Sequence, residues 1–198
     1  MRSAVRYLCI ILARFTEIIT TAILLALLIG CASNQLPVQQ FYTIKPFASD
    51  EQLLQGSVGI NNAELVIGQV TAPAYLAQAG IVIAGTEGNL ELANYHLWVE
   101  PPAVAIKRYL ERCALSDGKS IRKRQRIDIE IHRFQGDGSG GVIFDGVWNK
   151  YTVSDGAALG TFLFDYREPQ RGDGFGALAT ALSRTVEQLC VDILDKTL

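Results

Sequence analysis

One cysteine of this chain lies in a sequence context that defines a specific chemistry. Cys31 follows Leu28, Ile29 and Gly30 at the end of an apolar run, and a small residue directly before such a cysteine is the pattern of a bacterial lipobox. Cleavage between Gly30 and Cys31 would make Cys31 the new N-terminus, ready to carry lipid. We therefore expect a covalent diacylglycerol and an N-acyl chain on Cys31, and no other cofactor.

The segment before Cys31 has the features of a signal peptide. Arg2 and Arg6 give it a positively charged start, and an apolar stretch runs from 18 to 29. The apolar part of a signal peptide has about 7–15 residues, whereas a membrane-spanning helix needs about 20. We therefore expect residues 1–30 to be removed; the alternative is an uncleaved N-terminal anchor.

The residues after Cys31 indicate where the anchor is sorted. Ala32 and Ser33 follow the cysteine, and there is no aspartate to act as an inner-membrane retention signal. This favours the inner leaflet of the outer membrane, with the domain in the periplasm. Residues 31–40 are predicted to be a tether that reaches at most about 30 Å when extended.

The chain that remains after cleavage is large enough for one domain. Removing residues 1–30 leaves 168 residues and takes away three arginines and one glutamate, which moves the net charge from −2 to −4. A chain of this length can bury a proper core. The slightly acidic balance and the expected compartment both argue against a nucleic-acid partner.

Two cysteines remain in the part of the chain that is expected to fold. Cys9 is lost with the signal peptide and Cys31 is acylated, which leaves Cys113 and Cys190 in an oxidising compartment. Both fall near the ends of predicted helices. A disulfide requires their Cα atoms to lie within about 7 Å; the alternative is two separately buried thiols.

Residues for catalysis or metal binding are scarce. His96 and His132 are the only histidines, and there is no CxxC pair. A catalytic triad needs a base that a third group orients, and His132 lies on the charged side of a predicted strand. Structural metal sites need clustered cysteines and histidines. We therefore predict neither a catalytic site nor a metal site.

A glycine-rich stretch at 136–141 matches the spacing G-x-G-x-x-G. A dinucleotide site requires a strand before this pattern and a helix after it. Here both flanking segments have the alternation of strands, so we expect a hairpin tip.

The apolar periodicities predict a sheet and two helices. Alternation and β-branched residues predict strands at 40–46, 57–67, 80–84, 89–93, 126–134, 142–153 and 160–167, with a helical turn at 73–77. A helix opens at Pro101 and Pro102 and stops before Asp117. A second apolar stripe marks a long final helix through Phe175, Leu178, Leu182, Val186, Leu189 and Ile193. The expected fold class is α+β, an antiparallel or mixed sheet with two main helices packed on one face.

A basic cluster precedes the predicted hairpin. It consists of Lys119, Arg122, Lys123, Arg124 and Arg126. One interpretation is a solvated loop. The other is a contact with lipid phosphates or with an acidic partner surface.

The most distinctive internal motif is His96-Leu-Trp98-Val-Glu100-Pro101. On the residues alone, Trp98 is a core residue that precedes a proline-started helix. Glu100 is placed to lie near the positive end of that helix.

These features together resemble the PqiC/YmbA-type, or ABC-type transport auxiliary, lipoproteins over nearly all of residues 41–198. The resemblance is carried by the lipobox at Cys31 and by His96-x-Trp98-x-Glu100-Pro101, with further matches at Phe41-Tyr42-Thr43-Ile44, at Pro73-x-Tyr75-Leu76 and at Ile106 and Leu110. The chain departs from the family pattern at Ala77, where an aspartate is usual, and at Pro102, where a leucine is expected.

The resemblance implies a non-enzymatic role. It implies an outer-membrane partner of MCE-domain proteins and of inner-membrane transporter components, in a system that moves lipids across the periplasm and supports envelope integrity. Self-assembly into a homo-oligomer, and a lipid-binding groove in place of simple docking, stay open. Two other classes are a structural envelope lipoprotein without a transporter, and a periplasmic hydrolase that joins His96 or His132 to a carboxylate and a nucleophile.

Overall fold

The computed structural model describes residues 37–44, 65–85, 88–116 and 124–197. The predicted signal peptide, the cleavage position at Gly30 and Cys31, and most of the predicted tether lie outside the described residues. Two units divide the chain, Met1–Val38 and Gln39–Leu198. The second unit holds every helix and strand described below.

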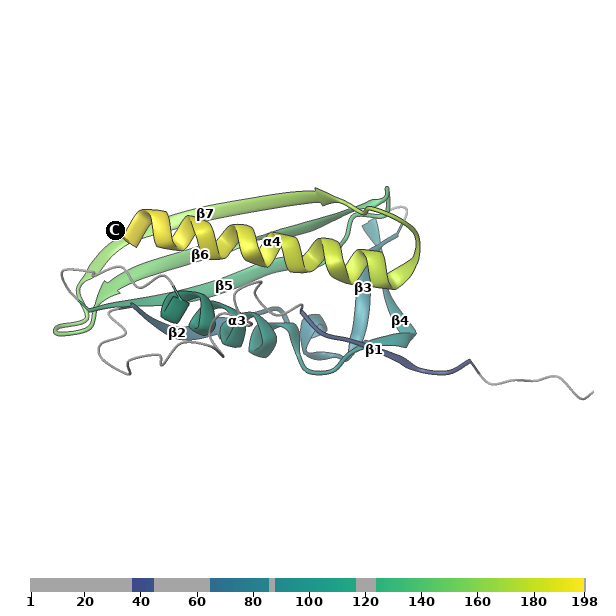
Figure 1. Ribbon diagram of the computed structural model, residues 1–198, viewed down its shortest axis with the longest axis horizontal. Helices are drawn as coiled ribbons and strands as arrows, with labels where there is room; N and C mark the ends of the chain where they lie inside the picture. The colour runs from purple at the N-terminus through teal and green to yellow at the C-terminus, as the bar shows by residue number, and fades with distance from the viewer. Residues whose placement is uncertain (1–36, 45–64, 86–87, 117–123, 198) are drawn as a thin grey trace, which may run out of the picture. The chain divides into compact units, whose positions relative to one another are not determined.

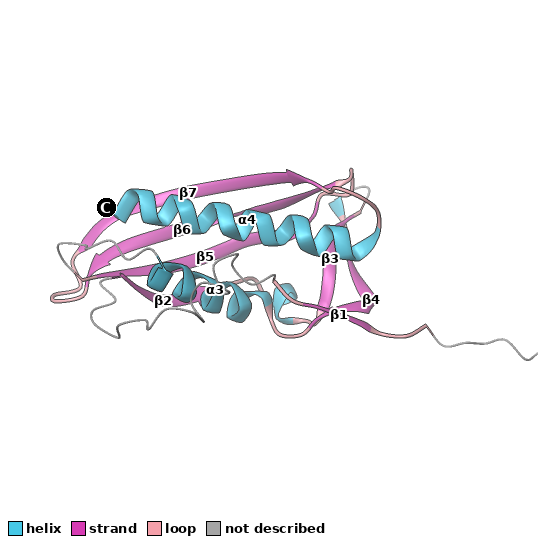
Figure 2. Ribbon diagram, in the orientation of Figure 1, coloured by secondary structure: helices cyan, strands magenta, loops and turns pink. Residues whose placement is uncertain are grey.

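In the described part of the chain, seven strands form one mixed sheet (Figures 1 and 2). Their order is β1-β4-β3-β5-β6-β7, and β2 pairs with β5. The strands are β1 (Gln40–Tyr42), β2 (Leu65–Thr71), β3 (Gly80–Ala84), β4 (Leu90–Trp98), β5 (Gln125–Gly136), β6 (Gly141–Thr152) and β7 (Ala158–Pro169). The long strands β5, β6 and β7 pair antiparallel, whereas β1 runs parallel to β4 and β2 runs parallel to β5.

Two helices lie along one face of this sheet (Figure 2). They are α3 (Pro102–Ser116) and α4 (Gly174–Thr197), and a short 3-10 helix η1 (Ala74–Ala77) precedes β3. Helix α4 packs against β5, β6 and β7, while α3 packs against β2 and α4. The predicted α+β class with both helices on one face of the sheet is therefore confirmed.

The ends of three strands differ from the prediction. The strand predicted at 40–46 ends at Tyr42, since Thr43 and Ile44 are not in a strand, and residues 45 and 46 lie outside the described residues. The segment predicted as a strand at 89–93 continues to Trp98, and the strand predicted to end at 67 continues to Thr71; residues 57–64 lie outside the described residues. The pairing of β3 with β4 shifts register between Gly80 and Val82, so the alternation along β4 is interrupted. The end of β4 pairs with β1, a partner far away in the sequence that local periodicity does not reveal.

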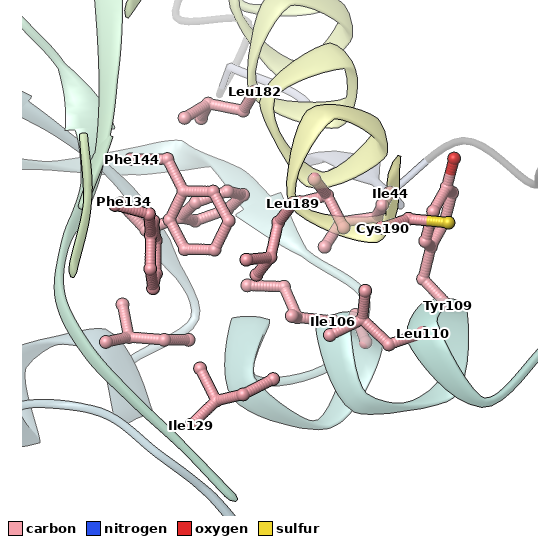
Figure 3. Packing of buried hydrophobic residues seen from close by; sticks show 14 of the residues in the cluster. Ile44, Ile106, Tyr109, Leu110, Ile129, Phe134, Phe144, Leu182, Leu189 and Cys190 are labelled. Atoms are coloured by element: carbon pink, nitrogen blue, oxygen red, sulfur yellow. The ribbon is translucent and has the colours of Figure 1, made fainter. Parts of the chain in front are cut away.

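The core lies between the helices and the sheet. Ile127, Ile129 and Ile131 of β5 are all buried, which confirms the predicted alternation of that strand. Helix α4 buries the predicted stripe from Leu178 to Ile193. Figure 3 shows side chains from both helices and from the sheet directed into one space, among them Ile106 and Leu110 of α3, Leu182 and Leu189 of α4, and Phe134 and Phe144 of the sheet.

The glycine-rich stretch is a hairpin tip between β5 and β6. One carboxylate oxygen of Asp137 accepts the backbone N–H groups of Ser139 at 2.7 Å and Gly141 at 2.9 Å. Gly138 has φ +76°, and a Cβ there would lie 2.3 Å from the carbonyl oxygen of Ala84. Partial burial raises the pKa of Asp137, but the hydrogen bonds outweigh burial and hold the pKa below its ordinary value. The turn is therefore fixed by local hydrogen bonds and by a glycine that no other residue could replace without strain.

Polar contacts fasten α4 to the edge strand β7. The hydroxyl of Tyr166 donates to Asp192 at 2.9 Å, and the ammonium of Lys196 reaches the same carboxylate at 2.7 Å. Burial, and then the hydrogen bond to Asp192, raise the pKa of Tyr166 above its ordinary value of 10.0.

The substitution Tyr166→Phe is expected to flatten the alkaline pH dependence of stability. Below pH about 10 the phenol is protonated in both states; as pH rises further, the unfolded phenol ionises while the folded one keeps its proton, so the native protein loses stability. The variant lacks this alkaline loss. At neutral pH its free energy of unfolding is lower by about 0.5–1.5 kcal/mol, because the hydrogen bond to Asp192 is missing. Urea unfolding at about pH 8 and about pH 11 measures both effects. An equal alkaline loss in both proteins would contradict the prediction.

Candidate functional site

The residues of the sequence motif lie where the end of β4 meets β1 and the start of α3. His96 and Trp98 are register partners of Gln40 and Tyr42 in the parallel pairing of β1 with β4. Glu100 and Pro101 follow in the turn that leads into α3. The motif therefore joins the first strand of the domain to its first long helix.

His96 connects β1 to the first turn of α4. Its Nδ1 lies 3.0 Å from the hydroxyl of Tyr42, and its ring stacks on Phe175 with centroids 3.9 Å apart and planes 13° from parallel. The Tyr42 hydroxyl donates its single proton to Gln40 at 2.7 Å, so the bond to His96 requires Nδ1–H as the donor. The imidazole is thus held by a phenol on one side and an aromatic ring on the other.

Trp98 lies in the core, with 4% of its surface exposed. Its ring centroid is 5.8 Å from that of Phe134, and its backbone N–H donates to the carbonyl of Ala79 at 2.7 Å. The next residue, Val99, donates its N–H to the carbonyl of Tyr42 at 2.9 Å. Side chain and backbone therefore tie β4 to the residue before β3, to β5 and to β1.

Glu100 and Pro101 determine how α3 begins. The carbonyl of Pro101 accepts the N–H groups of Val104 at 2.9 Å and Ala105 at 3.2 Å. The carboxylate of Glu100 forms an ion pair with the guanidinium of Arg108 farther along α3. A carboxylate beside the start of a helix also interacts favourably with the helix dipole.

A pocket of about 220 Å³ lies between the end of β1 and α3. It is lined by Thr43, Ile44, Glu100, Ala105, Arg108, Tyr109 and Arg112. Sites for drug-sized ligands usually measure about 300–1,000 Å³, and the charge of Arg108 is matched here by Glu100. The pocket therefore has neither the size nor the apolar lining of a groove for lipid chains.

Within the part of the chain that the structure describes, neither histidine has the neighbours of a catalytic base. His96 contacts Tyr42 and Phe175, while exposed His132 lies 3.7 Å from the exposed carboxylate of Glu130. Over the described residues, no three of His, Cys, Asp and Glu come together in a way that could hold a metal ion. The arrangement of both histidines is that of residues that stabilise strands and packing.

A disulfide joins Cys113 of α3 to Cys190 of α4, with Cα atoms 6.4 Å apart. Both cysteines are buried, and Figure 3 shows Cys190 of α4 beside Tyr109 and Leu110 of α3. The sequence left open a disulfide or two separately buried thiols, and the structure contains the disulfide. It connects the two helices at a sequence separation of 77 residues.

Two members of the basic cluster are described, and they differ in their surroundings. The guanidinium of Arg126 lies 3.0 Å from a carboxylate oxygen of Asp128 and stacks 4.8 Å from the ring centroid of Tyr151. Arg124 is exposed and directly precedes β5. Lys119, Arg122 and Lys123 lie outside the described residues, so a lipid or partner contact through this cluster stays a prediction.

The cluster of Tyr42, His96 and Phe175 was missed by the sequence analysis. The three rings come from β1, β4 and α4, and Tyr42 is 54 residues from His96. The available signal was weak: Tyr42 and His96 both occur in the segments that carry the family resemblance, and Phe175 begins the apolar stripe of the last helix.

Comparison with known proteins identifies the family. The model of the ABC-type transport auxiliary lipoprotein component family matches residues 42–194. No curated protein sequence matches the chain. Among the described residues, no helix is both long and apolar enough to span a membrane.

Solved structures share this fold. A crystal structure of an uncharacterized protein aligns with a TM-score of 0.63 at 18% identity, covering 80% of this chain and 98% of that one. Protein XCC0632 from Xanthomonas campestris aligns with a TM-score of 0.57, also at 18% identity, covering 65% of this chain and 79% of the other. The family model spans the β1–α4 fold and includes the motif at its centre. The chain belongs to the family of ABC-type transport auxiliary lipoprotein components.

Proposed function

We propose that this protein is an outer-membrane lipoprotein, anchored at the periplasmic face through Cys31, that serves as an auxiliary component of an MCE-type intermembrane lipid transport system. The observation that carries the proposal is the family match over residues 42–194, in a chain whose lipobox cysteine lies shortly before the first strand. Its role is to hold and dock a periplasmic MCE assembly at the outer membrane and so to support envelope integrity.

The anchor follows from the chemistry at Cys31. Diacylglycerol and an N-acyl chain together supply several acyl chains, and two or more chains hold a protein stably at a membrane. The absence of aspartate at positions 32 and 33 supports sorting to the outer membrane. Residues 31–40 then act as the tether, and residues 41–198 as the domain that meets the partner.

A docking role agrees with the chemistry of the described residues. The polar members of the motif take part in contacts within the domain: His96 with Tyr42, and Glu100 with Arg108. The charged groups on β5, β6 and β7 form ion pairs at or near the surface, which suits protein recognition better than catalysis. We therefore assign the protein no enzymatic activity.

Crosslinking in living cells, followed by membrane fractionation, tests the proposal. The wild-type protein should be acylated, sediment with the outer membrane and crosslink to an MCE-domain protein. Cys31→Ala should lose the acyl chains and, with them, recovery of the partner from outer-membrane fractions. Ala32→Asp is the matched control, because it keeps the acylated cysteine and introduces the inner-membrane retention signal.

Each step of the proposal has its own contrary result. An unmodified wild-type Cys31, seen by mass spectrometry, would reject the anchor. Acylated wild-type protein in the inner membrane would reject outer-membrane sorting. Correctly sorted protein that crosslinks only to structural envelope proteins would reject the transport role and favour a structural lipoprotein.

A further inference from the structure

Four apolar side chains gather on β1 and the end of β4, close to the predicted tether. Phe41 is 61% exposed, Val99 is 65% exposed and Tyr95 is 43% exposed. Leu97, which is half-buried, is the register partner of Phe41. We call these four residues the β1–β4 patch.

Phe41 and Leu97, at the centre of the patch, face away from the helices. Tyr42 and His96 reach toward Phe175 at the first turn of α4, and Trp98 enters the core, so these residues mark the helix-covered face. Neighbouring residues of a strand point to opposite faces of the sheet. Phe41 and Leu97 therefore lie on the open face. Tyr95 and Val99 belong to the patch because they are the exposed apolar residues on either side of Leu97.

The two chain segments that carry the patch are uncharged. Residues 37–44 contain no charged side chain, and within residues 92–99 the one titratable side chain besides Tyr95 is His96, whose ring is on the other face. The same open face farther along the sheet is rich in charges, at Arg126, Asp128, Arg133, Asp145, Asp165 and Arg167. The patch is thus less charged than the part of this face formed by β5, β6 and β7, where exposed Leu163 lies among the charged groups.

The apolar end is also the end to which the anchor is attached. Phe41 lies ten residues after Cys31, a span of at most about 35 Å even when fully extended. Figure 1 shows β1 and β4 at the opposite end of this unit from the C-terminal end of α4. A lipid on Cys31 would keep the patch at a high local concentration near the membrane surface.

We propose that the β1–β4 patch is a second, non-covalent membrane contact that rests in the headgroup–acyl boundary of the bilayer to which Cys31 is anchored. The inference rests on the proposed lipidation of Cys31. Tyr95 suits that boundary because its ring can enter the acyl region while its hydroxyl stays at the headgroups. Phe41 adds an exposed apolar ring beside it. The contact orients the domain, with its β1–β4 end toward the lipid.

Tryptophan fluorescence in the full-length acylated protein tests the inference. Phe41→Trp is reconstituted in vesicles of phosphatidylethanolamine and phosphatidylglycerol whose acyl chains carry bromine close to the headgroup. The two native tryptophans, Trp98 and Trp148, are 4% and 0% exposed, so they supply a background that lipid does not reach. Leu163→Trp is the matched control, because Leu163 is an 80% exposed leucine on β7. Brominated lipid should quench the Phe41→Trp probe several-fold more than the Leu163→Trp probe.

The contrary outcomes separate this inference from the proposed function. Mass spectrometry of the same sample reports the acyl chains, so their absence is a failure of the anchor. Acylated protein in which both probes are quenched equally would overturn the membrane contact. A Phe41→Trp probe that is blue-shifted but unquenched would also overturn it, because a protein surface would then cover the patch. Tyr95→Trp gives an independent second probe with the same expected result.

Discussion

Replacing Cys113 and Cys190 together with alanine is expected to lower the free energy of unfolding by about 2–5 kcal/mol. The bridge closes a loop with a sequence separation of 77 residues, for which chain entropy alone accounts for about 4.5 kcal/mol. Both cysteines are buried between α3 and α4, so the variant also loses packing at the contact between the two helices. Helix α3 also packs against β2 and η1, so we expect the variant to stay folded.

Urea unfolding with and without a thiol reductant measures the effect. The reductant should destabilise the wild-type protein by nearly the same amount as the double substitution, and it should leave the double variant unchanged. This internal control separates the bridge from the loss of two sulfur atoms. A reductant that does not change the wild-type midpoint would contradict the prediction.

Trp98→Ala is expected to destabilise the domain by about 3–5 kcal/mol, the usual loss for a large buried aromatic side chain. The indole fills the space next to Phe134 at the point where β4 turns toward α3. The cavity would loosen the residues on either side of it, His96 and Glu100, which contact β1, α4 and α3. Trp98→Phe keeps most of the ring and should lose clearly less.

Val99→Ala is the neighbouring control for this measurement. Val99 is 65% exposed, so truncating it should change stability by no more than about 0.5 kcal/mol. Thermal or urea unfolding of the three variants should rank Trp98→Ala as the least stable, followed by Trp98→Phe and then Val99→Ala. Similar stabilities for Trp98→Ala and Val99→Ala would show that the motif tryptophan does not contribute to the core.

The parts of the fold that were predictable are those in which one face of a single element is buried. In β5 the isoleucines at 127, 129 and 131 alternate with polar residues, so the sequence of this segment alone predicts a strand with one buried face. In α4 the stripe from Leu178 to Ile193 repeats with the period of a helix. Such patterns depend only on the geometry of one element and on which of its faces is buried. They can therefore be recognised without knowing which element packs against that face.

The end of β4 could not be predicted in this way. Tyr95 is exposed and Leu97 half-buried, and the register with β3 shifts, so residues 94–98 show no regular alternation. What makes this segment a strand is its parallel pairing with β1, which lies more than fifty residues earlier. Pairings at that distance follow from the whole topology.

The candidate site was likewise predictable only in the parts that depend on local sequence. The chemistry expected at Cys31 follows from four adjacent residues and needs no fold. The contact of His96 with Tyr42 and Phe175 depends on the register of β1 and on the position of α4, which are properties of the assembled domain. The pairing of Cys113 with Cys190 is intermediate, because counting cysteines named the two partners but only the packing of α3 on α4 brings their Cα atoms to 6.4 Å.

The short strand β1 also has a mechanical consequence. If a partner held by the domain pulls against an anchor at Cys31, the tension enters the domain through Gln40 and acts first on a ladder of three register pairs with β4. Each of the strands β5, β6 and β7 has twelve residues, so their ladders share a load over many more bonds. Under force β1 would detach before the rest of the sheet, lengthening the link to the membrane while the core stays folded. If the proposed anchor and partner are correct, β1 would thus act as an extensible joint in a connection between two membranes whose separation fluctuates.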